Sequence, residues 1–141
     1  MAKIITIDAS LKLEGEKTGS VAEGVGVAVG GLGVDKAYIE NIATKKRIPL
    51  DSIIIKMSQE EAIMPMKKEI FNSLGRIKEI IEDNIKLTRE KGVILIVGVG
   101  NSCGIDNNEK AVEKVKNVLK KVWKRKKKEK KERGILSFFG E

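Results

Sequence analysis

The sequence contains no histidine, a single cysteine and few aromatic residues. Without histidine, a Ser-His-Asp triad, a Cys-His pair and an ordinary His-ligated zinc or iron site are excluded. Cys103 alone can form neither an internal disulfide nor a four-thiolate metal cluster, as expected of a protein in a reducing cytosol. Aromatic residues make up 4% of the 141 residues, so the core of this one-domain chain has to be built from Ile, Val, Leu and Ala.

Long apolar runs are also missing. The longest uncharged apolar stretch, Gly24 to Val34, contains five glycines and is shorter than the roughly 18 to 20 residues that a bilayer helix requires. The N-terminal residues MAKIITID lead into a β-type segment and lack the layout of a secretory signal. We therefore expect a cytoplasmic protein with no membrane partner.

The positive charge is concentrated in one segment. The formal net charge is +8, and residues 120–133 hold ten basic residues against two acidic ones. The remainder of the chain is balanced, so the globular part shows no basic footprint for nucleic acid in its sequence. We predict three regions: an α/β domain over residues 1–123, a basic helical extension or linker over 124–134, and a hydrophobic peptide over 135–141.

The apolar periodicity predicts alternating strands and helices. Short β-branched runs at Lys3 to Asp8, Ser52 to Met57 and Val93 to Val99 are typical of strands covered on both faces. Val34, Tyr38 and Ile42 recur at helical spacing before Pro49. The ambiguous segment 19–33 fits either a helix or a strand, and a short helix is favoured.

Two longer helices follow from capping signals. Ser58 with Glu61 forms a capping box, and the helix that follows carries one apolar stripe, with a kink or restart expected at Pro65. This stripe consists of Ile63, Met66, Ile70, Leu74, Ile77 and Ile81. Asp106 with Glu109 forms a second capping box before a helix whose apolar face ends at Trp123. That face consists of Ala111, Val112, Val115, Val118, Leu119, Val122 and Trp123. The fold class is an α/β layered sandwich with a mostly parallel sheet of three or four strands and a long basic C-terminal helix.

Polar residues follow each predicted strand, where ligands gather in parallel sheets. Carboxylates there are candidates for acid–base catalysis (Asp8, Glu60 and Glu61) or for Mg²⁺ (Asp8, Glu14 and Glu16). Candidate ligand-binding residues are Ser10, Lys12, Lys17, Thr18, Ser58, Gly98, Gly100, Asn101 and Ser102. Simpler readings compete, since Ser58 and Glu61 fit as helix caps and Asp8 as a turn residue. Whether the protein is an enzyme stays open at this stage.

Three segments resemble a known family. They are KLEGEKTGSVAEGVGVAVGGLGVDK, IPLDSIIIKMSQEEAIMPMKKEI and VGVGNSCGI. They look like the globular part of an archaeal family of unknown function, normally a longer protein with an extra N-terminal region, over roughly residues 3 to 105. The resemblance implies no established activity, but it implies that loops at the predicted strand ends are family features. Because this chain begins at its first strand, functions that need the longer region are expected to be absent.

The C-terminal residues resemble a second pattern. Residues 132–139 are similar to the peptide by which replication and repair proteins bind the PCNA sliding clamp, with Ile135, Phe138 and Phe139 at its hydrophobic positions. One turn that presents an aliphatic and two aromatic side chains can fill a hydrophobic pocket. Glu132 occupies the glutamine position, which is a departure.

Two functional hypotheses follow. The first is a DNA replication or repair accessory tethered to the clamp, with the Lys120 to Arg133 segment attracting nucleic acid non-specifically. The alternatives for the two terminal phenylalanines are packing on the domain itself or an oligomer contact. The second hypothesis is a domain or enzyme that binds a nucleotide or phosphate, with Mg²⁺ as the candidate cofactor, at the strand ends.

Overall fold

The strands form where the β-branched runs predict them. The computed structural model describes residues 1–24, 34–99 and 108–136. Strands β1 (Lys3–Leu11), β3 (Leu50–Met57) and β4 (Ile94–Gly98) correspond to the three predicted runs, and a short β2 (Val21–Gly24) joins them. The sheet has the order β2-β3-β1-β4. Strand β1 pairs in parallel with both β3 and β4, so the predicted fold class is confirmed.

The segment from Gly19 to Gly33 departs from the prediction. Its residues Val21–Gly24 form β2, antiparallel to β3, and not the favoured short helix. The pairing places Val21 opposite Ile55, where it packs against the buried core. Small residues at three- and four-residue spacing imitate a helix locally, but burial against a neighbouring strand decides the conformation. The prediction for residues 25–33 lies outside the described residues.

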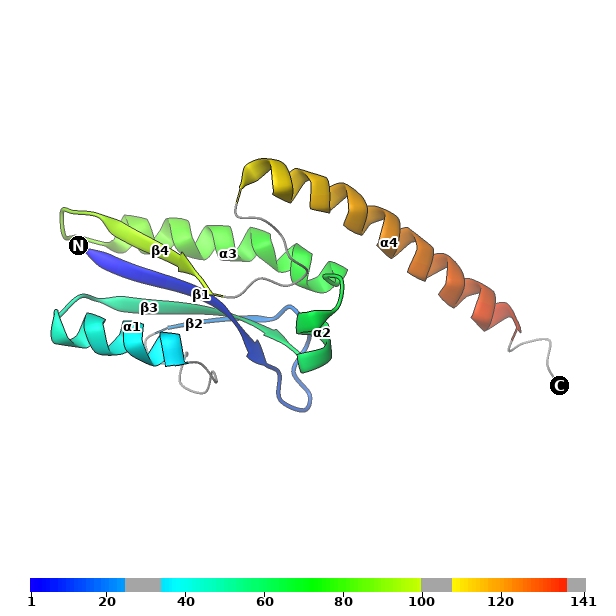
Figure 1. Cartoon of the computed structure of the whole chain (residues 1–141), viewed down its shortest axis with the longest axis horizontal. Helices are drawn as coiled ribbons and strands as arrows, with labels where there is room; N and C mark the ends of the chain where they lie inside the picture. Colours follow the sequence, from blue (N-terminus) through cyan, green and yellow to red (C-terminus); the bar gives the residue numbers. More distant parts are fainter. Residues whose placement is uncertain (25–33, 100–107, 137–141) are drawn as a thin grey trace.

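Helices cover both faces of the sheet. The two parallel crossovers run in opposite directions, from β1 to β3 through α1 (Val34–Lys45) and from β3 back to β4 through α3 (Lys68–Leu87). Right-handed crossovers in opposite directions place their helices on opposite faces, as Figure 1 shows for α1 and α3. Ile5 and Ile53 pack on Ile77 and Ile80 of α3 to form the core.

The face on the side of α1 contains a polar pair. Thr6 and Ser52 are both buried there, and their hydroxyl oxygens lie 2.8 Å apart in a hydrogen bond. Ala43 of α1 is buried, whereas Tyr38, which belongs to the predicted apolar spacing, is 66% exposed. The inner layer on this side therefore relies on small and β-branched residues.

At Pro65 the predicted long helix is interrupted, and a second helix starts after it. Helix α2 (Gln59–Ile63) begins with the predicted capping box of Ser58 and Glu61, and α3 begins only at Lys68. Ile63 lies in the short α2 and is 81% exposed, so it is not part of the long apolar stripe as predicted. Leu74 of α3 is also exposed, at 43%. Buried residues of α3 are Ile70, Ser73, Ile77 and Ile80.

Helix α4 (Glu109–Leu136) leaves the body at its C-terminal half, as Figure 1 shows. It begins at Glu109, and the side chain of Asn108 accepts a hydrogen bond from the Ala111 backbone N–H at 2.9 Å. The helix start thus differs from the predicted Asp106–Glu109 box, whose Asp106 lies outside the described residues. Leu119 is buried, but Val118 is 54% exposed and does not belong to the docked face as predicted.

Candidate functional site

The parallel strands bring their carboxyl ends together, as predicted. A cavity of about 350 Å³ opens between these ends and the start of α3. Asp8 is the ionisable side chain among its described lining residues, and its carboxylate accepts a hydrogen bond from the Ala9 backbone N–H at 2.7 Å. The other lining residues are Ile7, Ala9, Ile55, Met57, Ala62, Met66, Ile70, Gly98 and Val99. This cavity is apolar with one carboxylate at its wall.

Other predicted residues at these ends are only partly brought together. Ser10 is half-buried and donates weakly to the Leu11 carbonyl oxygen at 3.5 Å. Gly98 closes β4 at the cavity. Gly100, Asn101 and Ser102 lie outside the residues that the structure describes, as does Cys103.

Glu61 forms the centre of a polar cluster away from that cavity. Its side chain is 6% exposed and accepts hydrogen bonds from Lys67 Nζ at 2.5 Å, from the Thr18 hydroxyl at 2.9 Å and from the Ser58 backbone N–H at 2.8 Å. Lys12 Nζ donates to the Thr18 hydroxyl oxygen at 2.8 Å and lies 3.6 Å from Glu61. The cluster joins the β1–β2 loop to the start of α3.

These contacts keep Glu61 charged. The hydrogen bond with Lys67, followed by those with the Ser58 N–H and the Thr18 hydroxyl, lowers the pKa of Glu61 from 4.5 to about 2, against the opposing effect of burial. Both carboxylate oxygens are engaged by donors. A carboxylate held in this way suits the attachment of a loop better than proton transfer near neutral pH. Thr18 and Ser58, both predicted ligand-binding residues, point their hydrogen-bonding groups at Glu61.

Within the described residues, the remaining predicted carboxylates share no hydrogen-bond or ion-pair partner with the Glu61 cluster and do not form a second one. Glu14 and Glu60 are exposed, and Glu16 accepts from the Leu13 N–H at 2.7 Å and pairs with Lys56 at 3.5 Å. Across residues 1–24, 34–99 and 108–136, no three acidic or cysteine side chains come close enough to hold a metal ion. A Mg²⁺ site made from Asp8, Glu14 and Glu16 therefore has no geometric support in the described part.

A cationic groove is the feature that the sequence does not reveal. This lysine groove, of about 730 Å³, lies between the β1–β2 loop, the turn from α2 to α3, and α4. Six lysines line it, together with Glu16 and Glu69 and with Trp123. The lysines are Lys12, Lys17, Lys67, Lys68, Lys126 and Lys127. Lysines of the charge-balanced body thus join those of the basic helix on one surface.

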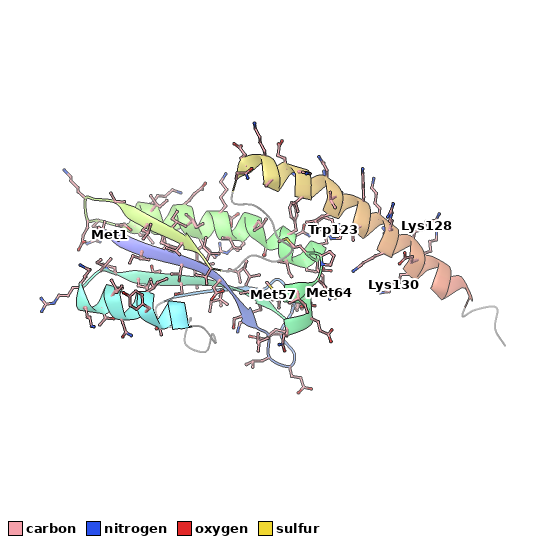
Figure 2. The ribbon with its side chains drawn as sticks, in the orientation of Figure 1. Met1, Met57, Met64, Trp123, Lys128 and Lys130 are labelled. Carbon is pink, nitrogen blue, oxygen red and sulfur yellow. The ribbon has the colours of Figure 1, made fainter. Side chains whose placement is uncertain are left out.

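Trp123 fixes α4 beside this groove. Its indole N–H donates to the Met66 carbonyl oxygen at 2.8 Å, and its ring meets the Phe71 ring edge-on with centroids 5.4 Å apart. Figure 2 shows Trp123 directed from α4 toward α3, with Lys128 and Lys130 on the part of α4 that follows. Lys126 and Lys127 come one turn after Trp123, so this contact sets their position.

The second contact that shapes the groove is made by Gly19. Its φ of +81° is unfavourable for residues with a side chain, and a Cβ there would lie 2.5 Å from the Glu69 carbonyl oxygen. The β1–β2 loop therefore approaches the first turn of α3 at a distance that only glycine allows. Lys17 and Thr18 are carried to the groove by this approach.

The basic segment lies on α4, which continues without a break past residue 123. Every residue from Lys124 to Lys131 is exposed. Glu132 and Ile135 lie within the helical backbone of α4, whereas Phe138 and Phe139 fall outside the described residues.

The fold and its sites define an α/β domain with a mostly parallel sheet, a lysine groove and a projecting basic helix. Residues 1–106 match a family described as the C-terminal domain of a protein family of unknown function (DUF1512), and the chain belongs to this family. The predicted resemblance to a family of unknown function is confirmed in this respect, whereas α4 lies outside the matched residues. No curated protein and no solved structure matches the chain. None of the helices in the described part is both long and apolar enough to span a membrane.

Proposed function

We propose that the protein is an accessory factor of DNA replication or repair, attached to nucleic acid by the basic part of α4 and to a sliding clamp by its C-terminal peptide. The observation that carries the proposal is the exposure of every residue from Lys124 to Lys131 on a helix that has already left the body. Cations held outside a charge-balanced domain attract phosphate backbones without regard to sequence. We further propose that the protein is cytoplasmic and comes from an archaeon.

Four cations of α4 that do not line the lysine groove provide the test for nucleic-acid attachment. They are Lys124, Arg125, Lys128 and Lys131, each replaced by Gln. We expect weaker binding of a labelled duplex oligonucleotide and a flatter dependence of affinity on salt, by roughly 0.9 in log–log slope for each lost phosphate contact. Fluorescence anisotropy at several salt concentrations measures both quantities.

The matched control replaces three lysines and one arginine elsewhere on the surface by Gln. Lys45, Lys46, Arg89 and Lys91 are all exposed and carry the same total charge. If the control weakens binding as much as the α4 variant does, net charge and not the projecting helix determines the affinity. Absence of any binding by the wild-type chain in low salt contradicts the attachment itself.

The clamp part of the proposal depends on Ile135, Phe138 and Phe139. Support comes from the spacing of these residues in the sequence and from the course of α4, whose end at Leu136 lies away from the body (Figure 1). Full-length protein is titrated against the sliding clamp of the source organism, with the variant Phe138→Ala/Phe139→Ala as control. Binding that the double variant abolishes supports the tether, and unchanged anisotropy at high micromolar clamp excludes it.

A small-ligand site at the strand ends is the second candidate function, favoured by the cavity beside Asp8. Of the residues predicted for this site, Asp8 lines the cavity, whereas Thr18 and Glu61 belong to the polar cluster and Lys17 to the lysine groove. Glu60 is exposed, and Asn101 lies outside the described residues. The proposed ligand is a nucleotide or phosphate, with Mg²⁺ as cofactor. A thermal-shift series with nucleotides and Mg²⁺ tests it, because a ligand at a hundred times its Kd stabilises a protein by about 2.7 kcal/mol. No stabilisation by any member of the series excludes this candidate.

A further inference from the structure

The lysine groove has a charge that its own carboxylates do not neutralise. Lys12 and Lys67 are directed to the buried Glu61, at 3.6 and 2.5 Å, and together they more than balance it. Glu16 is paired with Lys56 at 3.5 Å, outside the groove lining. Of the six groove lysines, Lys17, Lys68, Lys126 and Lys127 form no ion pair with an acidic side chain of the described residues. Glu69 is the remaining acidic side chain of the lining, so the surface stays strongly positive.

The fold fixes the backbone positions of these lysines. The Gly19 approach to Glu69 positions the loop that carries Lys17, and the Trp123 contacts with Met66 and Phe71 position the turn of α4 that carries Lys126 and Lys127. Lys68 is the first residue of α3. Cations fixed on three separate elements around one groove hold an extended anion better than cations along one helix, because less ordering is required on binding.

The groove also contains an aromatic ring. Trp123 is half-buried, meets Phe71 in an edge-on contact and is also one of the residues that line the groove. Proteins that bind single-stranded nucleic acid combine a positively charged groove along the backbone with an aromatic side chain on which a base stacks. A duplex keeps its bases stacked inside and presents only its convex phosphate surface, so it has no base to offer to Trp123.

From these observations we infer that the lysine groove holds single-stranded nucleic acid, with phosphates against Lys17, Lys68, Lys126 and Lys127 and a base against Trp123. This inference rests on the proposed function, in which nucleic acid is the partner, and it assigns the strand form and the place of binding. In this arrangement the body and α4 bind the same strand. The basic surface of α4 beyond the groove remains accessible to neighbouring phosphates.

The test compares charge reversals of equal size. The variant Lys17→Glu/Lys68→Glu reverses the charge of two exposed lysines of the groove. The control Lys45→Glu/Lys46→Glu reverses two exposed lysines at the end of α1, where Lys45 is the last helical residue and Lys46 follows it. We expect the groove variant to bind a labelled single-stranded oligonucleotide about tenfold or more weakly, with a salt slope flatter by roughly 0.7 for each lost contact. The control is expected to change the affinity by about threefold or less, since distant exposed charges are screened. Circular dichroism of both variants verifies the fold.

Trp123 supplies a second measurement, because it is the only tryptophan of the chain. We expect its fluorescence to be quenched by the single-stranded oligonucleotide and to change little with a duplex of equal phosphate number or with inorganic phosphate. Equal quenching by the duplex overturns the assignment to single strands. Equally tight binding of an oligoglutamate of the same length overturns the assignment to nucleic acid.

The outcomes separate this inference from the proposed function. If the wild-type chain binds nucleic acid but the groove variant matches its control and Trp123 fluorescence does not change, the groove inference fails and attachment by α4 stands. If the wild-type chain binds neither strand form, both fail. If the groove variant alone loses the single strand and Trp123 is quenched, the inference is supported.

Discussion

The indole nitrogen of Trp123 donates a hydrogen bond to the Met66 carbonyl oxygen at 2.8 Å, across 57 positions of the chain. This contact joins α4 to the turn that begins α3, and the Phe71 ring completes it. Every residue from Lys124 to Lys131 is exposed, so up to residue 131 Trp123 is the last residue of α4 that packs on the body. The position of the basic part of α4 therefore depends on the docked residues that precede it, among them the buried Leu119 and Trp123.

Replacing Trp123 tests that dependence. We expect Trp123→Leu to lower the free energy of unfolding by about 1 to 3 kcal/mol, because it loses both the ring contact and the hydrogen bond of a half-buried side chain. Trp123→Phe keeps an aromatic ring against Phe71 and is expected to lose less. Urea unfolding followed by circular dichroism measures both. Equal losses for the two variants would show that the ring contact contributes little.

Because Glu61 is charged in the folded protein, the free energy of unfolding is expected to decrease at low pH. Its pKa in the folded protein, about 2, lies below the ordinary 4.5, so the stabilisation is fully present above pH 4.5 and is lost as the pH falls toward 2. A shift of this size corresponds to at most about 3 kcal/mol, and solvent screening of the half-exposed Lys67 reduces it to roughly 1 to 2 kcal/mol.

Urea unfolding of Glu61→Gln between pH 7 and pH 2 tests this assignment. The variant is expected to be less stable than wild type at pH 7 and to approach it near pH 2. Glu60→Gln, on the exposed side of the same helix, serves as control and should follow the wild-type profile. Parallel profiles for Glu61→Gln and wild type would exclude Glu61 as the source of the acid sensitivity.

Gly19 and Gly15 form a matched pair in the β1–β2 loop. Both have positive φ, +81° and +86°, but only at Gly19 would a Cβ meet the Glu69 backbone, since nothing lies within 4 Å at Gly15. We expect Gly15→Ala to cost about 1 kcal/mol for backbone strain alone, and Gly19→Ala to cost more, roughly 2 to 4 kcal/mol. Thermal unfolding measures the difference. Similar costs at the two positions would mean that the loop moves away from α3 without penalty.

The buried hydroxyl pair under α1 predicts non-additive effects. Thr6→Val removes the hydrogen-bonding partner of the Ser52 hydroxyl and should cost about 1 to 2 kcal/mol. In the double variant Thr6→Val/Ser52→Ala neither hydroxyl is left unsatisfied, so the loss should be smaller than the sum of the single losses. Denaturant unfolding of the two single variants and the double variant measures the coupling. Strict additivity would show that the 2.8 Å contact has no energetic effect.

The sequence predicted the parts of the fold that local patterns determine. The β-branched runs located β1, β3 and β4, and Ser58, Glu61 and Pro65 located the boundary between α2 and α3. Strand β2 was the less favoured of the two conformations predicted for its segment, because its residues become a strand only by pairing with β3, a non-local effect. The exposure of Val118 depends likewise on how α4 docks, which periodicity alone does not specify.

The lysine groove could not be predicted from charge along the chain. Residues before 120 carry 18 basic and 17 acidic side chains, and that near-balance conceals their distribution in space. Lys12 and Lys17 precede β2, whereas Lys67 and Lys68 begin α3, and only the tertiary fold places them beside α4. The sequence does contain a weak indication of the groove, since its six lysines come in three pairs that are close along the chain: Lys12 and Lys17, Lys67 and Lys68, and Lys126 and Lys127.

Helix α4 also fixes the position of its C-terminal end relative to the sheet. At 1.5 Å per residue, the part beyond Trp123 extends roughly 20 Å from its last docked residue. A continuous helix of that length behaves as a rigid lever, so an object gripped at its tip takes a defined orientation relative to the sheet. Inserting one residue after Trp123 would turn that object by about 100° around the helix axis while advancing it by only about 1.5 Å.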